Sequence, residues 1–143
     1  MNVIFDLDGT LADLTHREHL IQGEQKDWAT FFLQCVHDKP IHSTILVNNA
    51  LYKAGHSIDI WTGRSDMVKV ETIVWLAKYG IRYNNLKMRP GLDHTPDNIL
   101  KQSWLLETPP YERPHIVFED RQIVVDMWRS HNIQCAQVAP GAF

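Results

Sequence analysis

The sequence has few cysteines and no long apolar run, and each shortage excludes a class of protein. Among its 143 residues are two cysteines, Cys35 and Cys135, which are too few for a disulfide framework and too far apart for a chelating pair. We interpret both as small core residues. No apolar run reaches the roughly 18 residues that a membrane-spanning helix needs, and the N-terminus lacks the pattern of a signal peptide. We therefore expect a cytoplasmic protein that does not associate with membranes.

Positive charge is also scarce. Lys and Arg total 14 against 17 Asp and Glu, so the formal net charge is −3. A protein that binds nucleic acid along an extended basic groove is usually strongly positive. We therefore expect this chain to bind a polyanionic partner only at a small local site. The length, with 44% hydrophobic residues, fits one domain that covers residues 1–143.

Short apolar runs typical of strands alternate with helical patterns along the chain. We predict strands at 2–6, 57–61, 86–88, 115–119 and 134–138, and helices at 41–53, about 70–79, 97–107 and 121–130. Such alternation implies a parallel sheet whose two faces are covered by helices. The sequence therefore predicts a three-layer, Rossmann-like α/β fold with five parallel strands.

Apolar spacing also predicts which face of each helix is buried. We expect Val70, Ile73, Val74 and Ala77 to form the inner face of the helix that ends before Gly80. In the last helix, we expect Val124, Met127 and Trp128 to point inward.

A more polar insert, about residues 12–39, follows the first strand. Within it, Trp28, Phe31, Phe32, Cys35 and Val36 are spaced as on one face of a short amphipathic helix. This helix would form a minimal cap beside the sheet. Its aromatic side chains could stack on a base as a lid or simply pack in the core, and the sequence leaves both alternatives open.

Polar side chains follow three of the predicted strands. In parallel sheets, ligands bind beyond the carboxyl ends of the strands, and all three polar groups belong to that edge. They are Asp6 and Asp8 after the first strand, Thr62 and Arg64 after the second, and Glu119 and Asp120 after the fourth.

The first of these groups could supply a nucleophile and an acid or base to one site. A turn at Gly9 would let Asp6 and Asp8 face one pocket, with Asp6 as a nucleophile and Asp8 as an acid and base. Asp120 adds a carboxylate from a neighbouring strand. Clustered carboxylates repel one another unless a cation lies among them, and an all-oxygen set suits Mg²⁺.

These motifs resemble those of the haloacid dehalogenase superfamily of phosphotransferases. The string from Val3 to Leu11, VIFDLDGTL, is similar to the first motif of that family. Thr62 resembles its phosphate-binding Ser or Thr, and Lys101 resembles the lysine that holds the phosphate and offsets the charge of the nucleophile. The pair 119–120 resembles its acidic metal motif. The resemblance implies a Mg²⁺-dependent phosphatase with Asp6 as the nucleophile.

Within this superfamily, the chain bears a closer resemblance to the 3′-phosphatase domain of phage-type polynucleotide kinase-phosphatase. Residues 119–129, EDRQIVVDMWR, and 135–143, CAQVAPGAF, match the end of that domain nearly residue by residue. Arg17 and Arg64 match its two substrate-phosphate arginines, and Asp97 matches the acidic partner of the lysine. The resemblance implies that Thr62, Gly63, Arg64, Lys101, Arg17 and Asp97 bind the phosphate or substrate, and that Asp6, Asp8, Asp120 and Glu119 hold Mg²⁺.

Two features depart from this pattern. Glu119 stands where the family usually has an aspartate, so position 119 could contact the metal directly or through water. The chain also has no Gly-x-x-x-x-Gly-Lys-[Ser/Thr] loop, so we expect the kinase half to be missing from it. The sequence leaves open whether a separate kinase or ligase acts alongside.

The sequence leaves three functions open. The first is a phosphomonoesterase that acts on polynucleotide 3′-phosphate ends through an aspartyl-phosphate. The second keeps this chemistry but uses free nucleotides or another small phosphate ester. The third is a receiver-like signalling domain, which also has an acidic Mg²⁺ site and a phosphorylated aspartate. Arg89 and His94 are expected at the same edge of the sheet and have only this location in favour of a substrate contact. The oligomeric state is left open.

Overall fold

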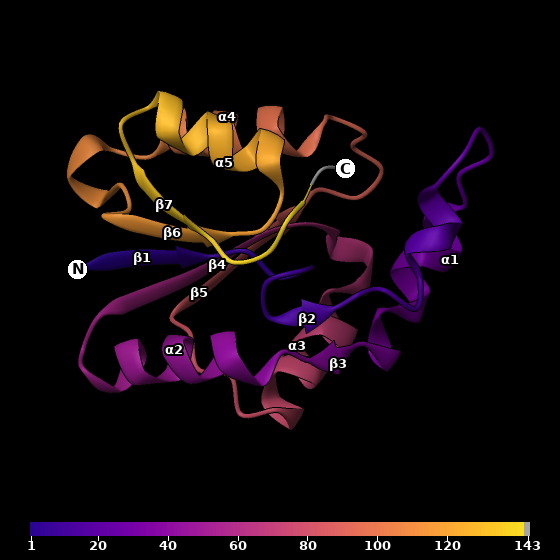
Figure 1. The fold of residues 1–143 in the computed structure, drawn as a ribbon, viewed down its shortest axis with the longest axis horizontal. Coiled ribbons are helices and arrows are strands. Elements are labelled where there is room, and N and C mark those ends of the chain that lie inside the picture. Colours follow the sequence, from indigo (N-terminus) through magenta and orange to yellow (C-terminus); the bar gives the residue numbers. More distant parts are fainter. Residues whose placement is uncertain (142–143) are drawn as a thin grey trace.

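The computed structural model describes residues 1–141 and has three layers, a parallel sheet between two pairs of helices (Figure 1). The five strands lie in the order β5-β4-β1-β6-β7, and every pairing is parallel. They are β1 (Asn2–Phe5), β4 (Ser57–Ser65), β5 (Asn85–Arg89), β6 (Ile116–Glu119) and β7 (Gln134–Gln137). The predicted α/β class with a five-stranded parallel sheet is confirmed.

The helices cover the two faces of the sheet in pairs. Figure 1 shows α2 (His42–Lys53) and α3 (Lys69–Lys78) on one face, and α4 (Asp97–Glu107) and α5 (Gln122–Ser130) on the other. β1 lies in the centre, paired with β4 and β6, so its Val3, Ile4 and Phe5 are buried. This explains why its sequence is apolar throughout rather than alternating. The carboxyl ends of the strands meet at one edge of the sheet.

A separate cluster of apolar side chains fills the space on each side of the sheet. Between the sheet and α4 and α5, the ring of Trp61 lies 5.7 Å from that of Trp104 and 5.7 Å from that of Trp128. On the α2 and α3 side, Phe5 and Ile60 pack among other apolar residues. α5 turns Val124, Met127 and Trp128 inward as predicted. Cys35 and Cys135 are both buried, also as predicted.

β4 is longer than the sequence predicted. We expected this strand to end at Trp61, but it continues to Ser65, and its pairing with β5 shifts register between Thr62 and Ser65. Thr62, Gly63 and Arg64 therefore lie in the irregular end of a strand rather than in a loop. The strand pairing holds their backbone in place at the carboxyl edge.

The predicted inner face of α3 is wrong. The helix buries Thr72, Trp75 and Leu76, whereas Val70 is 71% exposed and Val74 is 61% exposed. Two of the buried residues carry polar groups with buried partners: the hydroxyl of Thr72 accepts from Arg64, and the indole of Trp75 donates to a main-chain carbonyl. A count of aliphatic spacing cannot detect such partners, and for this reason it selected the wrong face.

The insert between β1 and α2 is closed by a short antiparallel pair of strands. β2 (Ala12–Asp13) pairs with β3 (Lys39–Pro40), and between them lie α1 (Trp28–Leu33) and 3-10 helices at Glu18–Ile21 and Gln34–His37. Further 3-10 helices lie at Asp66–Val68 and Pro110–Glu112. Figure 1 shows the insert extending past the carboxyl edge of the sheet. In the following text, "the insert" means residues 14–38.

The single amphipathic helix predicted in the insert is only partly right. The chain changes from α-helix to 3-10 helix after Leu33, so the expected apolar face breaks into two. Phe31 and Cys35 are buried, but Trp28 is 40% exposed and Val36 is 43% exposed. The insert thus contributes Phe31 to the interior and leaves Trp28 partly at the surface.

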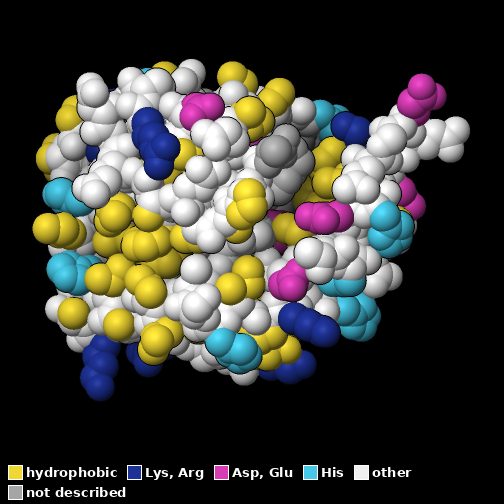
Figure 2. Space-filling model, in the orientation of Figure 1, with side chains coloured by type: hydrophobic (Ala, Val, Ile, Leu, Met, Phe, Trp, Pro, Cys, Tyr) yellow, Lys and Arg dark blue, Asp and Glu magenta, His cyan; other side chains and the backbone are white. Residues whose placement is uncertain are grey.

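None of the helices in residues 1–141 is both long and apolar enough to cross a membrane. On the face shown in Figure 2, Lys and Arg side chains lie scattered, and histidines lie on the side of the insert and also at the opposite margin.

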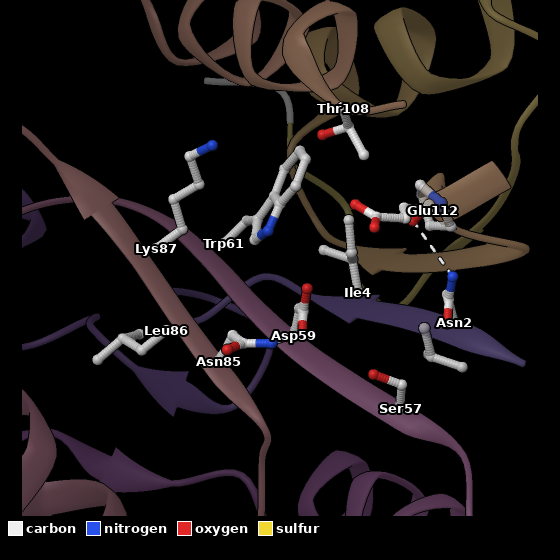
Figure 3. Close-up of a pocket in the computed structure, with 12 residues that line it drawn as sticks. Asn2, Ile4, Ser57, Asp59, Trp61, Asn85, Leu86, Lys87, Thr108 and Glu112 are labelled. Carbon is white, nitrogen blue, oxygen red and sulfur yellow. Dashed lines mark hydrogen bonds between the residues drawn. The ribbon is translucent and has the colours of Figure 1, made fainter. Parts of the chain in front are cut away.

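One hollow, of about 520 Å³, lies over the amino-terminal half of β1, β4 and β5 (Figure 3). Polar side chains such as Ser57 and Asp59 line it together with Trp61, and the ammonium of Lys87 lies 5.2 Å from the centre of the Trp61 ring. None of the predicted site residues lines this hollow. The residues of the predicted site therefore lie elsewhere, at the opposite end of the strands.

Candidate active site

Asp6 and Lys101 form the centre of the site. Asp6 directly follows β1, and Lys101 extends from the second turn of α4. The Lys101 ammonium donates to Oδ1 of Asp6 at 2.7 Å and to Oε2 of Glu119 at 3.0 Å. All three side chains are almost completely buried. The fold thus joins residues 95 positions apart in a buried ion pair. Removal of one partner from such a pair would leave an uncompensated buried charge.

The carboxylates around Lys101 outnumber it. Asp6, Glu119 and Asp120 can each offer an oxygen such that these atoms lie within 4.8 Å of one another. Burial, and next the charge of Glu119, raises the pKa of Asp6 well above its usual range. Burial is also the largest cause that raises the pKa of Glu119 and that of Asp120, each to about 7. Such a cluster favours either extra protons or a bound cation.

A glycine makes room for this cluster. Gly9 has a φ of +85°, in the left-handed region, and a Cβ built on it would lie 2.0 Å from Oδ2 of Asp120. Position 9 therefore requires glycine for two reasons, the turn after the first carboxylates and the close approach of Asp120. This brings Asp120, at the end of β6, beside the loop that leaves β1.

Asp8 lies against two arginines rather than in the acidic cluster. Nη2 of Arg17 donates to Oδ1 of Asp8 at 2.7 Å, and Nη2 of Arg64 donates to the same oxygen at 2.5 Å. Burial alone would raise the pKa of Asp8, but the charges of Arg64 and Arg17 lower it to about 2. Because its side chain faces the arginines, a contact from Asp8 to a metal would have to come from its main-chain carbonyl.

The structure adds a residue that the sequence analysis missed. Asp38, at the end of the insert, accepts from Nε of Arg17 at 2.8 Å, from Nη2 of Arg17 at 2.7 Å and from Nη2 of Arg64 at 3.1 Å. His16 also contacts it, with Nε2 2.7 Å from Oδ1. No motif marks Asp38 in the sequence, because an aspartate before Lys-Pro looks like an ordinary turn residue.

The end of β4 meets the start of α4 beside Lys101. The hydroxyl of Thr62 is buried and accepts from the amide of Arg64 at 3.0 Å. A Cβ on Gly63 would lie 2.3 Å from Oδ1 of Asp97, whose other oxygen lies 3.5 Å from the Lys101 ammonium. Arg89 donates to the Gly63 carbonyl at 2.7 Å, so its guanidinium braces the backbone here.

The structure therefore brings the sequence-predicted residues together in two adjoining groups. One group surrounds the Lys101 ammonium, and the other surrounds the guanidinium groups of Arg17 and Arg64. The loop from Asp6 to Asp8 connects them. The ammonium and the two guanidinium groups, which contact Asp8, can bind a phosphate. The buried carboxylate of Asp6 can then attack its phosphorus.

Comparison with known proteins gives a match over the whole chain. The family model described as "Polynucleotide kinase PNKP phosphatase domain" matches residues 1–143. A chain in the "Structure of Pnkp1/Rnl/Hen1 complex" is 31% identical with a TM-score of 0.86, over 99% of this chain and 47% of that one. A chain in the "Structure of the Pnkp1/Rnl/Hen1 RNA repair complex" gives the same identity and TM-score over 99% and 43%. The present chain thus spans less than half the length of these two. Among curated proteins, no sequence matches it.

More distant structures share the fold alone. A putative phosphatase from Clostridium difficile is 18% identical with a TM-score of 0.66, over 95% of this chain and 83% of that one. The class C acid phosphatase from Bacillus anthracis is 12% identical with a TM-score of 0.69, over 99% and 66%. The C-terminal stretch used in the sequence comparison is described as far as Gly141, and its last residues, Ala142 and Phe143, lie outside the described part.

Proposed function

Because the chain belongs to the family of polynucleotide kinase PNKP phosphatase domains and is a phosphatase of the haloacid dehalogenase type, we propose that it removes the phosphate from polynucleotide 3′ ends. The observation that carries this proposal is the match of the polynucleotide-specific family over residues 1–143, beyond the fold shared with general phosphatases. The similar chains in a structure named as an RNA repair complex support the same substrate class. The match gives no support to the receiver-like alternative.

Asp6 is the proposed nucleophile. One of its carboxylate oxygens would form a bond to phosphorus as the bond from phosphorus to the 3′ oxygen breaks, which leaves an aspartyl-phosphate. Lys101, 2.7 Å from Oδ1, keeps this buried carboxylate in place and balances part of its charge. The hydroxyl of Thr10, 3.3 Å from Oδ2, donates to the other oxygen and restricts rotation of the side chain.

Asp8 is the proposed acid and base. It would give its proton to the departing 3′ oxygen and later take a proton from the water that hydrolyses the aspartyl-phosphate. In the free site, Arg64 and Arg17 hold the pKa of Asp8 at about 2. A substrate phosphate that draws the two guanidinium groups toward itself would remove this stabilisation of the charged form, so that Asp8 could carry the proton.

The phosphate itself would lie among Thr62, the amide of Gly63, Arg64, Lys101 and Arg17. Asp97, 3.5 Å from the ammonium, would keep Lys101 charged and aimed at this position. Burial opposes the charge of Lys101, but Asp6, Asp97 and Glu119 raise its pKa well above the usual value. The lysine is therefore a permanent cation during the reaction.

The acidic cluster fits Mg²⁺ by the chemistry of its donors. All donors are oxygens and they lie within reach of one ion. Burial raises the pKa of Glu119 and that of Asp120, and a cation among these carboxylates would offset this cost of their charge. Asp6, Asp120 and Glu119 would hold the ion, together with the main-chain carbonyl of Asp8. When bound, Mg²⁺ would neutralise charge on the phosphoryl oxygens.

The product of the proposed reaction is a substrate for other enzymes. Removal of the 3′-phosphate leaves a 3′-hydroxyl, which a ligase needs for end joining. We therefore also propose that a separate kinase or ligase uses the same ends.

The proposal is tested by a panel of substrates in the presence of Mg²⁺. Phosphate release should be fastest from a 3′-phosphorylated oligonucleotide, much slower from the same oligonucleotide with a 5′-phosphate, and abolished by EDTA. Asp6→Asn should remove turnover while the fold is retained, as judged by circular dichroism. Asp59→Asn, an equally conservative change in the remote hollow, is the matched control and should keep full activity.

Two results would contradict the proposal in different ways. Turnover of nucleoside monophosphates alone would favour the free-nucleotide alternative. Residual turnover in Asp6→Asn at the level of the Asp59→Asn control would contradict the covalent mechanism.

A further inference from the structure

We propose that Asp38 is a positioning residue that holds Arg17 and Arg64 as one fixed pair, so that both can bind the substrate phosphate. This inference rests on the proposed phosphatase function and adds a residue to its substrate-binding machinery. Asp38 reaches both guanidinium groups but lies outside every motif used to locate the site.

Asp38 contacts the guanidinium groups of both arginines. Arg17 binds it through Nε at 2.8 Å and Nη2 at 2.7 Å, a fork that uses both carboxylate oxygens. Arg64 shares Oδ2 through its own Nη2 at 3.1 Å. Such bidentate, charge-assisted pairs fix the plane of a guanidinium as well as its position. Asp38 therefore sets the orientation of Arg17 and its spacing from Arg64.

Asp8 and Asp38 share the Nη2 groups of both arginines but differ in exposure. The Asp8 side chain is 18% exposed, whereas the side chains of Asp38, Arg17 and Arg64 are 0% exposed. A phosphate can thus approach the guanidinium groups from the side of Asp8, where it would compete with that carboxylate. The Asp38 carboxylate is fully buried, so a substrate that enters beside Asp8 does not contact it directly.

The two guanidinium groups carry the same charge, so they need an anion that stays beside them while a phosphate replaces Asp8. Both arginines place an Nη2 on Oδ1 of Asp8, so they lie side by side and repel each other. When a phosphate competes with Asp8, Asp38 still supplies one negative charge and its three hydrogen bonds. The arginines can then exchange partners on the open side without separating.

Asp38 is itself fixed by the fold. Its main-chain carbonyl accepts from the indole of Trp75, on α3, at 2.9 Å. Remaining donors of the arginines are also engaged: Nη1 of Arg17 donates to the Phe31 carbonyl at 3.2 Å, and Nη1 of Arg64 donates to Thr72 at 3.1 Å. Because Arg17 lies near the start of the insert and Asp38 ends it, their ion pair joins the two ends of the insert, and the contact of Asp38 with Arg64 connects it to β4.

The test compares Asp38→Asn with Asp38→Glu and with the unmodified protein, all with Mg²⁺. An asparagine at position 38 has the same shape as the aspartate but carries no charge. Its NH₂ group would replace one of the two oxygens that accept from the arginines. We expect the affinity for orthophosphate, measured by calorimetry, to fall by about tenfold to a hundredfold, in line with the loss of hydrogen bonds to charged groups. KM for a 3′-phosphorylated oligonucleotide should rise by a similar factor, with a much smaller change in kcat. Asp38→Glu, which keeps the charge, should recover part of the affinity.

Asp27→Asn is the matched control. Asp27 is another aspartate of the insert, and its carboxylate caps α1 by accepting from the amide of Thr30 at 3.0 Å. This change removes the charge of an aspartate in the insert without touching the arginines, so phosphate affinity should stay unchanged. A folded Asp38→Asn protein whose affinity for orthophosphate matches this control would overturn the proposal, as would a loss confined to kcat.

A measurement on the unmodified protein covers the case in which Asp38→Asn does not fold. The NMR signal of the Arg17 Nε–H group, assigned by its absence in Arg17→Lys, should stay protected from solvent exchange during titration with orthophosphate. Loss of that protection would show that Asp38 releases Arg17 and would overturn the proposal. If the unmodified protein binds orthophosphate but does not hydrolyse the oligonucleotide, the proposed function fails, while Asp38 is still judged by phosphate affinity.

Discussion

Buried charges in this protein fall into two groups that differ in net charge. Arg17 and Arg64 face Asp8 and Asp38, so two positive charges meet two negative ones. Around Lys101, by contrast, one ammonium faces several carboxylates. The first group is complete within the chain itself, whereas the second lacks positive charge. The difference predicts that a cation and pH act mainly on the second group.

The pH dependence of stability follows from Glu119 and Asp120. Each has a pKa of about 7 in the folded chain, because burial opposes its charge, against ordinary values of 4.5 and 3.8. Between about pH 4 and pH 7, the folded protein retains protons that the unfolded chain has lost, so the free energy of unfolding falls as pH rises. Without metal, the melting temperature should therefore be lower near pH 7.5 than near pH 5.

Mg²⁺ should reverse this loss. The ion binds the deprotonated carboxylates of the folded state, so it should raise the melting temperature more near pH 7.5 than near pH 5. Asp8 has the opposite shift, but with a pKa lowered to about 2 its stabilising contribution is lost only below about pH 4. Asp120→Asn is the control and should flatten both effects in calorimetric melts. A melting temperature that is independent of pH and Mg²⁺ would contradict the assignment of the cluster.

At the scale of elements, the turn after β1 has a strict sequence requirement. Gly9 and Gly55 both have a positive φ, +85° and +93°, but only Gly9 lies against a functional side chain. Gly55→Ala should cost about 1–2 kcal/mol of backbone strain and leave activity unchanged. Gly9→Ala should cost more, because its Cβ would overlap Asp120, and should abolish phosphatase activity. Thermal melts and phosphate release measure the two effects; equal loss of activity in both variants would contradict the proposed contact.

The orientation of α3 gives a second prediction at this scale. Leu76 is fully buried and Val74 is 61% exposed, although the apolar spacing of the sequence placed Val74 inward. Leu76→Ala should lower the free energy of unfolding by about 2–5 kcal/mol, whereas Val74→Ala should change it by less than about 0.5 kcal/mol. Urea titrations of the two variants would measure this. The reverse order would mean that the sequence-predicted face is the buried one.

Elements of this fold differ in how far sequence could predict them. β1 could be located because its run of apolar residues ends in a motif with its own chemistry. The face of α3 could not, since its burial depends on Thr72 and Trp75, whose polar partners come from β4 and the insert. Local spacing predicts an element well where burial alone decides its orientation, and less well where long-range polar contacts decide it.

At the scale of the molecule, the topology explains why the motif residues of the candidate site could be predicted. The strand order β5-β4-β1-β6-β7 puts the ends of β4 and β6 on either side of β1. Residues at the ends of these three strands therefore lie close together, regardless of the sequence of the loops. The parallel sheet thus predicted the position of Asp6, Arg64 and Asp120. Asp38 lies in the insert, whose path no sheet rule determines, and only the structure brings it to the arginines.

The net charge of −3 and the local placement of cations predict how the protein binds nucleic acid. The cations proposed to meet the phosphate are Arg17, Arg64 and Lys101, and each is buried. With two or three phosphate charges neutralised, the logarithm of affinity should fall with the logarithm of salt concentration with a slope of about −2. Fluorescence anisotropy with the inactive Asp6→Asn variant and a 3′-phosphorylated oligonucleotide measures this slope. The same oligonucleotide with a 3′-hydroxyl should bind far more weakly, because the terminal phosphate supplies most of the contact. A slope steeper than about −4, or equal affinity for both oligonucleotides, would instead indicate an extended basic track along the strand.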